Sequence, residues 1–203
     1  MSTYPKTLMI GLVAVAILGT TCVTFSPNSE APMSSFLLDD FTSSRSKLGN
    51  SWQGYTDRVM GGLSDMTMAR ESEGGIPHLA LAGEVSLKNN GGFIQAELRL
   101  AQDGKSSFDA RNYKGVRLLA RAESEGYYLF LRTSKNFFPW SFYMAPLAVT
   151  GQWQEVRVPF SRFTKGDFGA FFSLDLAELA SVAVVAYKRE FSAKIDVREI
   201  GFY

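Results

Sequence analysis

Apolar and polar residues alternate with a period of two along much of the chain after residue 36, and this pattern constrains the fold more than any other feature. Successive side chains of a β-strand point to opposite faces, so the alternation predicts half-buried strands. We expect strands over residues 79–87, 94–100, 115–121, 155–160, 181–187 and 194–203. In the last strand the alternation slips between Val197 and Ile200, which predicts a β-bulge.

Turn-forming residues separate the predicted strands. They stand at residues 89–92, 103–104, 125–126, 150–151 and 165–167, and each of these segments contains glycine. Only residues 174–180 are typical of a helix, and that segment is short. Many short strands with half-polar faces predict an all-β fold, an antiparallel β-sandwich or jelly roll.

The N-terminal segment has a different composition. Residues 8–25 are uncharged and mostly apolar, and Lys6 precedes them. A positive flank before an apolar run is typical of a secretory signal or of an uncleaved anchor with its N-terminus inside. As an apolar helix the run would span roughly 27 Å, enough for the hydrocarbon core of a bilayer. An uncleaved anchor, a cleaved signal and lipid attachment at Cys22 all stay open. A buried helix is disfavoured, because a helix that is apolar on every side has no face for solvent.

These features divide the chain into three parts. Residues 1–26 are predicted to be a signal peptide or membrane anchor, and residues 27–35, rich in Pro, Ser and Asn, a linker. Residues 36–203 are predicted to form one domain. An apolar segment in this position predicts that the domain is membrane-anchored or exported and lies on the extracytoplasmic, periplasmic side.

Composition argues against several functions. The chain has 21 basic and 20 acidic residues, so removing Lys6 leaves 20 of each, without the basic surplus of a nucleic-acid-binding protein. Cys22 and His78 are the only cysteine and histidine. No catalytic residue, metal site or cofactor is therefore predicted, and His78 is expected to be structural or solvated. Asp39 and Asp40, adjacent on a strand, should face opposite ways, with strand-end solvation and one turn hydrogen bond.

Residues 52–64 read W-Q-G-Y-T-D-R-V-M-G-G-L-S and stand out from the alternating pattern. Gly61 and Gly62 permit positive φ angles and close backbone approach. Asp57 and Arg58 can form charge-assisted hydrogen bonds. The segment is either a recognition loop or a structural corner in which Asp57 and Arg58 tie the loop to the sandwich, and the residues alone favour the corner.

The same segment resembles the hallmark of the complex I intermediate-associated protein family. The resemblance rests on D-R-V-M-G-G-L-S at residues 57–64, with Trp52 before it. Further matching segments are G-E-V-S-L at 83–87, N-N-G-G-F at 89–93, Y-K-G at 113–115, L-R-T at 131–133, and W-Q and V-P-F at 153–160, followed by Phe163. The resemblance covers residues 36–203. Gln95 and Glu97 depart from the serine and arginine of many members.

The resemblance implies a galactose-binding-like jelly roll that holds protein partners rather than converting a substrate, as does the assembly factor of respiratory complex I for which the family is named. The membrane would be contacted through the N-terminal segment. An alternative is a carbohydrate- or small-ligand-binding module at the cell envelope, because aromatic rings stack on sugars. The aromatic residues that suggest it are Tyr128, Trp140, Phe142 and Tyr143.

The predicted binding site combines two glycine-containing segments and one arginine. We expect the loop at residues 57–64 to lie beside the turn at residues 90–93. Alternation places Arg132 on a strand face with Tyr128 and Phe130, where it needs an acid or a carbonyl as its partner. Asp57 is the expected partner, because the resemblance includes both segments. The candidate residues are Asp57, Arg58, Met60, Gly61, Gly62, Ser64, Asn90, Gly91, Gly92, Phe93 and Arg132.

Overall fold

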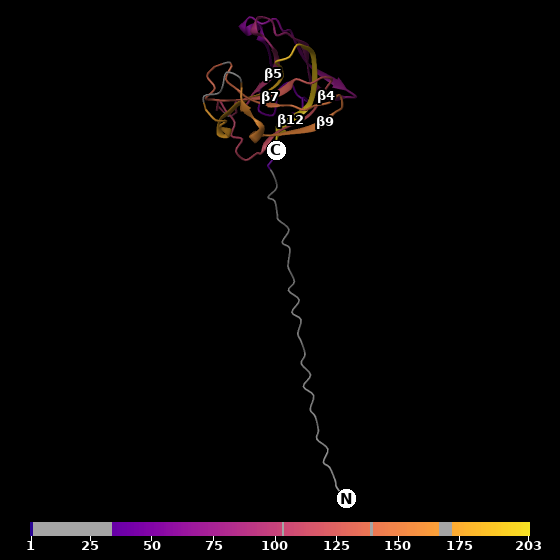
Figure 1. The fold of residues 1–203 in the computed structure, drawn as a ribbon, viewed down its shortest axis with the longest axis vertical. Coiled ribbons are helices and arrows are strands. Elements are labelled where there is room, and N and C mark those ends of the chain that lie inside the picture. Colours follow the sequence, from indigo (N-terminus) through magenta and orange to yellow (C-terminus); the bar gives the residue numbers. More distant parts are fainter. Residues whose placement is uncertain (2–33, 103, 139, 167–171) are drawn as a thin grey trace. The chain divides into compact units, whose positions relative to one another are not determined.

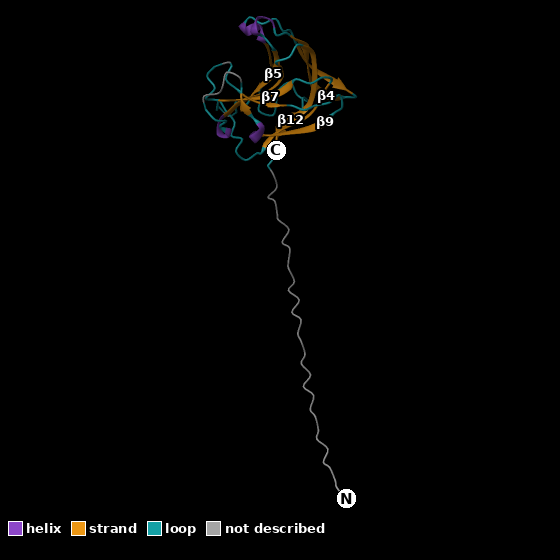
Figure 2. Ribbon diagram, viewed as in Figure 1, coloured by secondary structure: helices purple, strands orange, loops and turns teal. Residues whose placement is uncertain are grey.

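Two antiparallel β-sheets pack face to face and form a sandwich (Figures 1 and 2). The computed structural model describes Met1 and residues 34–102, 104–138, 140–166 and 172–203. The sandwich belongs to a compact unit, Pro32–Tyr203. The apolar helix predicted within residues 1–26, including Cys22, lies outside the described residues. Within the described part of the chain, no helix has the length and apolar character needed to cross a membrane.

The first sheet has the strand order β3-β4-β12-β6-β9, with β1 also paired to β12. Strand β12 occupies the centre because it is long enough to pair with three others. On one edge it pairs with β4 through Phe191–Val197 and then with β1 through Ile200–Phe202. The strands are β1 (Phe36–Asp39), β3 (Thr67–Glu73), β4 (Ile76–Val85), β6 (Gly115–Ala122), β9 (Gln154–Pro159) and β12 (Phe191–Phe202).

The second sheet has the order β10-β8-β7-β11-β5-β2, and all its neighbouring pairs are antiparallel. Its strands are β2 (Gln53–Thr56), β5 (Phe93–Arg99), β7 (Tyr127–Thr133), β8 (Tyr143–Pro146), β10 (Thr164–Lys165) and β11 (Leu179–Tyr187). The described residues include four short 3-10 turns. The turns η1 (Asp57–Met60), η2 (Lys88–Asn90) and η3 (Phe160–Arg162) connect one sheet to the other, and η4 (Leu176–Glu178) precedes β11 within the second sheet.

The inward faces of both sheets form the main hydrophobic core. Leu129 and Leu131 of β7 and Val182 and Val184 of β11 point into it and are almost fully buried. The alternate residues of the same strands form a second, smaller cluster on the outer face of the second sheet. Every described residue of both clusters lies between Phe36 and Phe202, so a chain that begins at Ser34 retains the core of the described part.

The six strands predicted from alternation are all present. The slip in the last strand is also confirmed, because the register of β12 against β6 shifts between Val197 and Glu199. The helix predicted over residues 174–180 is wrong. Asp175 accepts a hydrogen bond from the Ala177 backbone N–H and caps a single 3-10 turn. Leu179 then begins β11, where it pairs with Thr133, so tertiary pairing overrides local helix propensity.

The prediction for Asp39 and Asp40 is half right. Asp40 lies near the surface and pairs with Lys47 at 2.8 Å. Asp39 is not solvated, since it is buried and accepts a hydrogen bond of 2.9 Å from the Trp52 indole N–H. It also accepts from the Phe41 backbone N–H at 2.8 Å. Asp39 therefore joins β1 to the segment that precedes β2.

The described chain enters and leaves the sandwich at one end, which we call the terminal end. There Phe36 of β1 pairs with Phe202 of β12. The turns η1 and η2 lie at the opposite end, at the top of the view in Figure 1, and we call this the signature end.

Candidate functional site

The first candidate site is the signature loop, residues 57–64, at the signature end. The loop begins as the 3-10 turn η1, whose N-terminus is capped by the Thr56 hydroxyl accepting a hydrogen bond from the Arg58 backbone N–H. Gly61 ends the turn at φ 94°, a left-handed conformation that favours glycine. The sequence thus folds locally as a single turn with defined start and end.

The Asp57 carboxylate is fully buried and joins three segments of the chain. Within the loop it accepts hydrogen bonds from the backbone N–H and the hydroxyl of Ser64. From the start of β5 it accepts hydrogen bonds from the backbone N–H groups of Gly92, at 2.6 Å, and Phe93, at 3.3 Å. The Ser64 hydroxyl also accepts from the Ser86 backbone N–H, which extends the network to the end of β4.

Two glycines allow the backbone to approach this carboxylate. A Cβ atom on Gly62 would lie 2.3 Å from Asp57, and one on Gly91 would lie 2.4 Å from its Oδ2. Contacts of this length do not occur between non-bonded atoms, so neither position accepts a side chain without a shift. Gly62 and Gly91, one from each double glycine, therefore both leave room for the Asp57 carboxylate. This shared role was not apparent from the sequence.

These hydrogen bonds confirm that the signature loop and the turn at residues 90–93 lie side by side. A further contact joins the Asn89 side chain to the Gly61 carbonyl at 3.3 Å. Arg58 turns back to the loop and donates from Nε to the Ser64 carbonyl at 2.8 Å. Asn90 is exposed and adopts a φ of 57°.

The expected pairing of Asp57 with Arg132 is wrong. All the hydrogen bonds of the Asp57 carboxylate come from Ser64, Gly92 and Phe93. Arg132 is half-buried on the outer face of the second sheet, where burial lowers its pKa and the charge of Glu97 opposes that shift. Arg132 does share a strand face with Tyr128 and Phe130, as predicted. Asp57 instead accepts hydrogen bonds at the signature end, from the Ser64 hydroxyl and from backbone N–H groups.

The outward side of the signature loop carries apolar side chains. Of these, only Met60 was among the predicted site residues. Val59 is 71% exposed, Met60 55% and Leu63 51%. Leu87, in the segment that precedes η2, is also exposed. Ser64 thus points inward to Asp57, while three aliphatic side chains of the loop point to solvent beside the exposed Arg58. The run V-M-G-G-L between the polar residues was the signal in the sequence.

The outer face of the second sheet is the second candidate surface. Phe130 of β7 stacks on Phe142, with ring centroids 4.0 Å apart, and both side chains are buried. Tyr187 packs edge-on against both rings, Tyr128 packs edge-on against Tyr187, and the two tyrosines are half-exposed. The aromatic rings of this face therefore fill it by packing on one another.

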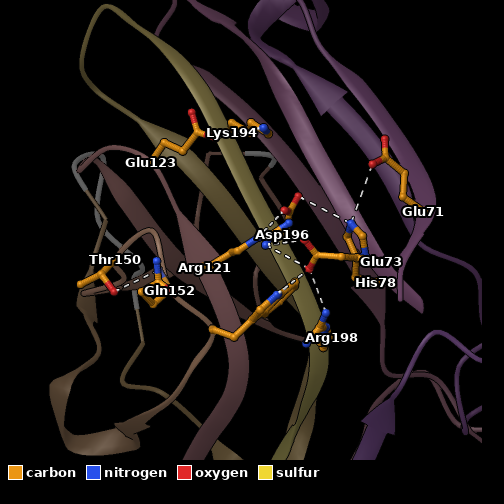
Figure 3. Close-up of polar contacts among 11 residues, drawn as sticks. Glu71, Glu73, His78, Arg121, Glu123, Thr150, Gln152, Lys194, Asp196 and Arg198 are labelled. Carbon is orange, nitrogen blue, oxygen red and sulfur yellow. Dashed lines mark hydrogen bonds and ion pairs between the residues drawn. The ribbon is translucent and has the colours of Figure 1, made fainter. Parts of the chain in front are cut away.

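The outer face of the first sheet carries a charged network and a shallow hollow of about 260 Å³ (Figure 3). The guanidinium groups of Arg121 and Arg198 both pack over the ring of Trp153, 4.6 and 4.0 Å from its centroid. Its indole N–H donates to Glu73, which also pairs with both arginines. Charges of opposite sign thus compensate one another across β3, β6 and β12.

His78 of β4 belongs to this face and is buried, with its Nε2 atom 3.8 Å from Glu71 and 4.0 Å from Asp196 (Figure 3). Its ring meets the edge of Trp153 at 5.7 Å between centroids. These contacts are structural. In the described ranges, no group of three or more His, Cys, Asp or Glu side chains is arranged to hold a metal ion.

Comparison with known proteins agrees with this architecture. Residues 40–194 match the family described as complex I intermediate-associated protein 30. Among curated proteins, none matches the chain. The sandwich is similar to a family 11 carbohydrate-binding module from a cellulosomal cellulase of Clostridium thermocellum, with a TM-score of 0.64 and 16% identity over 84% of this chain and 94% of that one.

Two further solved structures are similar. A family 11 module from Clostridium thermocellum in complex with a mixed-linked β-1,3-1,4 tetrasaccharide gives a TM-score of 0.62 at 16% identity, covering 83% of this chain and 94% of that one. A family 30 module of a Clostridium thermocellum cellulosomal cellulase gives 0.54 at 13% identity, covering 75% and 90%. These likenesses confirm the jelly-roll fold.

The buried carboxylate predicts a specific pH dependence of stability. Burial of Asp57 is the largest influence and raises its pKa, but the hydrogen bonds from Ser64, Gly92 and Phe93 together hold the pKa below its usual value. This stabilisation is present above the pKa of the unfolded chain and is lost as the pH falls through the lower pKa of the folded protein. Asp57→Asn should therefore flatten the decline of unfolding free energy below about pH 4, measured in urea titrations.

Asp57→Ala should lower the free energy of unfolding by about 3–5 kcal/mol at pH 7, because each unpaired buried donor costs about 1–3 kcal/mol.

Two glycine-to-alanine variants provide the control for the effect of crowding at Asp57. Gly91→Ala keeps the acid but crowds it, and should cost about 1–3 kcal/mol. Gly151→Ala, where a new Cβ meets no atom within 4 Å, should change stability by less than about 0.5 kcal/mol. Equal stability of Asp57→Ala and the wild type would show that the network does not hold this end together.

Proposed function

Because the chain belongs to the complex I intermediate-associated protein 30 family, we propose that it is a non-catalytic module that binds protein partners during assembly of a membrane complex of the respiratory type. The observation that supports this proposal is the outward-facing apolar side of the signature loop. Val59, Met60 and Leu63 are each more than half exposed, although they belong to a loop fixed from within by Asp57.

The physical argument is that a fixed apolar loop binds at low entropic cost. Exposed aliphatic side chains lose contact with water when a partner covers them, which is favourable. A mobile loop would lose conformational freedom on binding, whereas the hydrogen bonds to Asp57 have already ordered this one. Of the three side chains, Met60 is of a residue type that is enriched in protein interfaces.

The polar chemistry of the domain supports a non-catalytic role. His78, the single histidine, faces Glu71 and Asp196 rather than a nucleophile. Arg121 and Arg198 pair with Glu73 and lie against Trp153, so their charges are engaged in the network. This arrangement stabilises the sheet surface through compensated charges.

The partner proposal predicts the effect of removing the apolar side chains. The doubly substituted chain Val59→Ser, Met60→Ser should keep its melting temperature, because both side chains are exposed. Extracted from native membranes in mild detergent, it should recover subunits of a membrane complex at least about tenfold less than the wild type, a loss of about 1.4 kcal/mol. Quantitative mass spectrometry measures the recovery.

The matched control is Ile76→Ser, which removes another half-exposed aliphatic side chain at the start of β4. Its recovery of partners should equal that of the wild type. If the wild-type chain enriches no protein over a tag-only control, the proposed function is wrong.

Glycan binding is the second candidate, supported by similarity to carbohydrate-binding modules. On the second sheet, the half-exposed Tyr128 and Tyr187 and the half-buried Arg132 provide ring edges and hydrogen-bond donors suited to a sugar. A glycan array followed by thermal-shift measurement should then give a ligand whose stabilisation disappears in Arg132→Ala. The absence of any shift at millimolar oligosaccharide would remove this candidate.

The location that fits either function is the extracytoplasmic side of a membrane. Its support is Lys6 followed by the uncharged, mostly apolar run at residues 8–25. A reporter active only outside the cytoplasm, fused after Tyr203, should be active in intact cells. A stable fusion without reporter activity would show the opposite topology.

A further inference from the structure

The loop between β7 and β8 presents aromatic side chains to solvent at a place unrelated to the signature loop. Phe137 is 80% exposed, Phe138 45% and Trp140 46%, and we call these three residues the aromatic loop. Phe172, 55% exposed, follows in a segment that the Tyr143 hydroxyl contacts by donating to the Phe172 carbonyl at 2.9 Å. Such a concentration of exposed large rings is unusual on a soluble surface and indicates an interaction site.

The aromatic loop is held in place by its own polar residues. The Asn136 side chain accepts hydrogen bonds from the backbone N–H and the hydroxyl of Thr133, at 2.7 and 3.0 Å. Its amide donates to the Ser141 hydroxyl at 2.7 Å, and the Ser141 backbone N–H donates to the Phe138 carbonyl at 3.0 Å. Phe138 and Trp140 stack with centroids 5.2 Å apart. The hydrogen bonds of Asn136 and Ser141 therefore fix the loop in a conformation that exposes these rings.

The aromatic loop lies at the terminal end of the sandwich. Thr133, the last residue of β7, pairs with Leu179 of β11, and the Ser134 backbone N–H donates to the Glu178 carbonyl. Leu179 in turn bonds with Phe108, whose ring lies 5.3 Å from that of Phe36. The loop thus occupies the end at which the preceding segment joins the domain.

We propose that the aromatic loop inserts into the interfacial region of a lipid bilayer. The preceding chain supplies the first argument, because residues 8–25 are long and apolar enough to anchor the protein, and residues 27–35 extend at most about 30 Å. Tethering at the terminal end keeps this end within reach of the surface. Tryptophan and phenylalanine are suited to that position, because aromatic rings concentrate at the level of the lipid headgroups.

Charge supplies the second argument and identifies the type of surface. Lys135, the cation next to the loop, pairs with Asp175 at 2.6 Å, so the loop brings no free positive charge to the bilayer. The attraction is therefore apolar, and zwitterionic lipid suffices. This contact is independent of the proposed partner site, which lies at the opposite end.

The test uses the chain that begins at Ser34, which retains the core of the described part. One set of vesicles contains phosphatidylcholine alone, and a second set contains one part in four of phosphatidylglycerol. Wild-type protein should co-sediment equally with both kinds of vesicle. Lipids brominated near the headgroup should quench its fluorescence, and Trp140→Phe should abolish most of the quenching, because Trp52 is buried and Trp153 packs against Arg121 and Arg198 on the outer face of the first sheet.

The double substitution Phe137→Ser, Trp140→Ser should reduce the vesicle-bound fraction at least about tenfold and leave melting and partner recovery unchanged. Met60→Ser, at the other end, should bind vesicles like the wild type. Wild-type protein that stays in solution at millimolar lipid would overturn the proposal. So would a dimer, formed without lipid and abolished by the double substitution, because the loop would then join two copies of the chain. Neither result bears on the partner site.

Discussion

The hydrogen bonds to one buried carboxylate, that of Asp57, hold the signature end together. Residues 57–64 and the start of β5 are separated by about thirty positions along the chain. Neither residues 57–64 nor Gly92 and Phe93 contribute a side chain to the main hydrophobic core that could fix their spacing. A carboxylate can accept several donors at once, and here it takes two from Ser64 and one each from Gly92 and Phe93. The glycines at positions 62 and 91 follow from this arrangement, since any larger residue would occupy the space of the acid.

Much of the fold was predictable because strand alternation is a local property. The six predicted strands and the bulge in β12 each follow from residues within about ten positions of one another. The short strands β1, β2, β8 and β10 contain two to four residues each and are too short to show a period. The segment 174–180 shows the opposite failure, because its helical pattern is real but the pairing of Leu179 prevails.

The sequence predicted which residues belong to the candidate site, but it did not predict which hydrogen bonds join them. The sequence identified Asp57, the glycines and the neighbouring turn, yet it assigned the acid to Arg132, because a side-chain cation is a more obvious partner than three backbone N–H groups. Backbone donors are invisible in a sequence, since every residue except proline has one. Asp39 was misjudged for a related reason, because its partner Trp52 lies thirteen positions away.

The antiparallel pairing of β1 with β12 has a mechanical consequence. Phe36 begins β1 and Phe202 ends β12, and the two residues are paired, so the hydrogen bonds between these strands run parallel to the line that joins these two ends of the domain. Tension between those ends would unzip β1 from β12 one bond at a time, at low force. Tension between Phe36 and a load bound at η1 would instead run along the strands and shear many bonds at once. A complex pulled from the signature end would therefore meet a stiff domain, whereas the same pull through the C-terminus would meet a weak one.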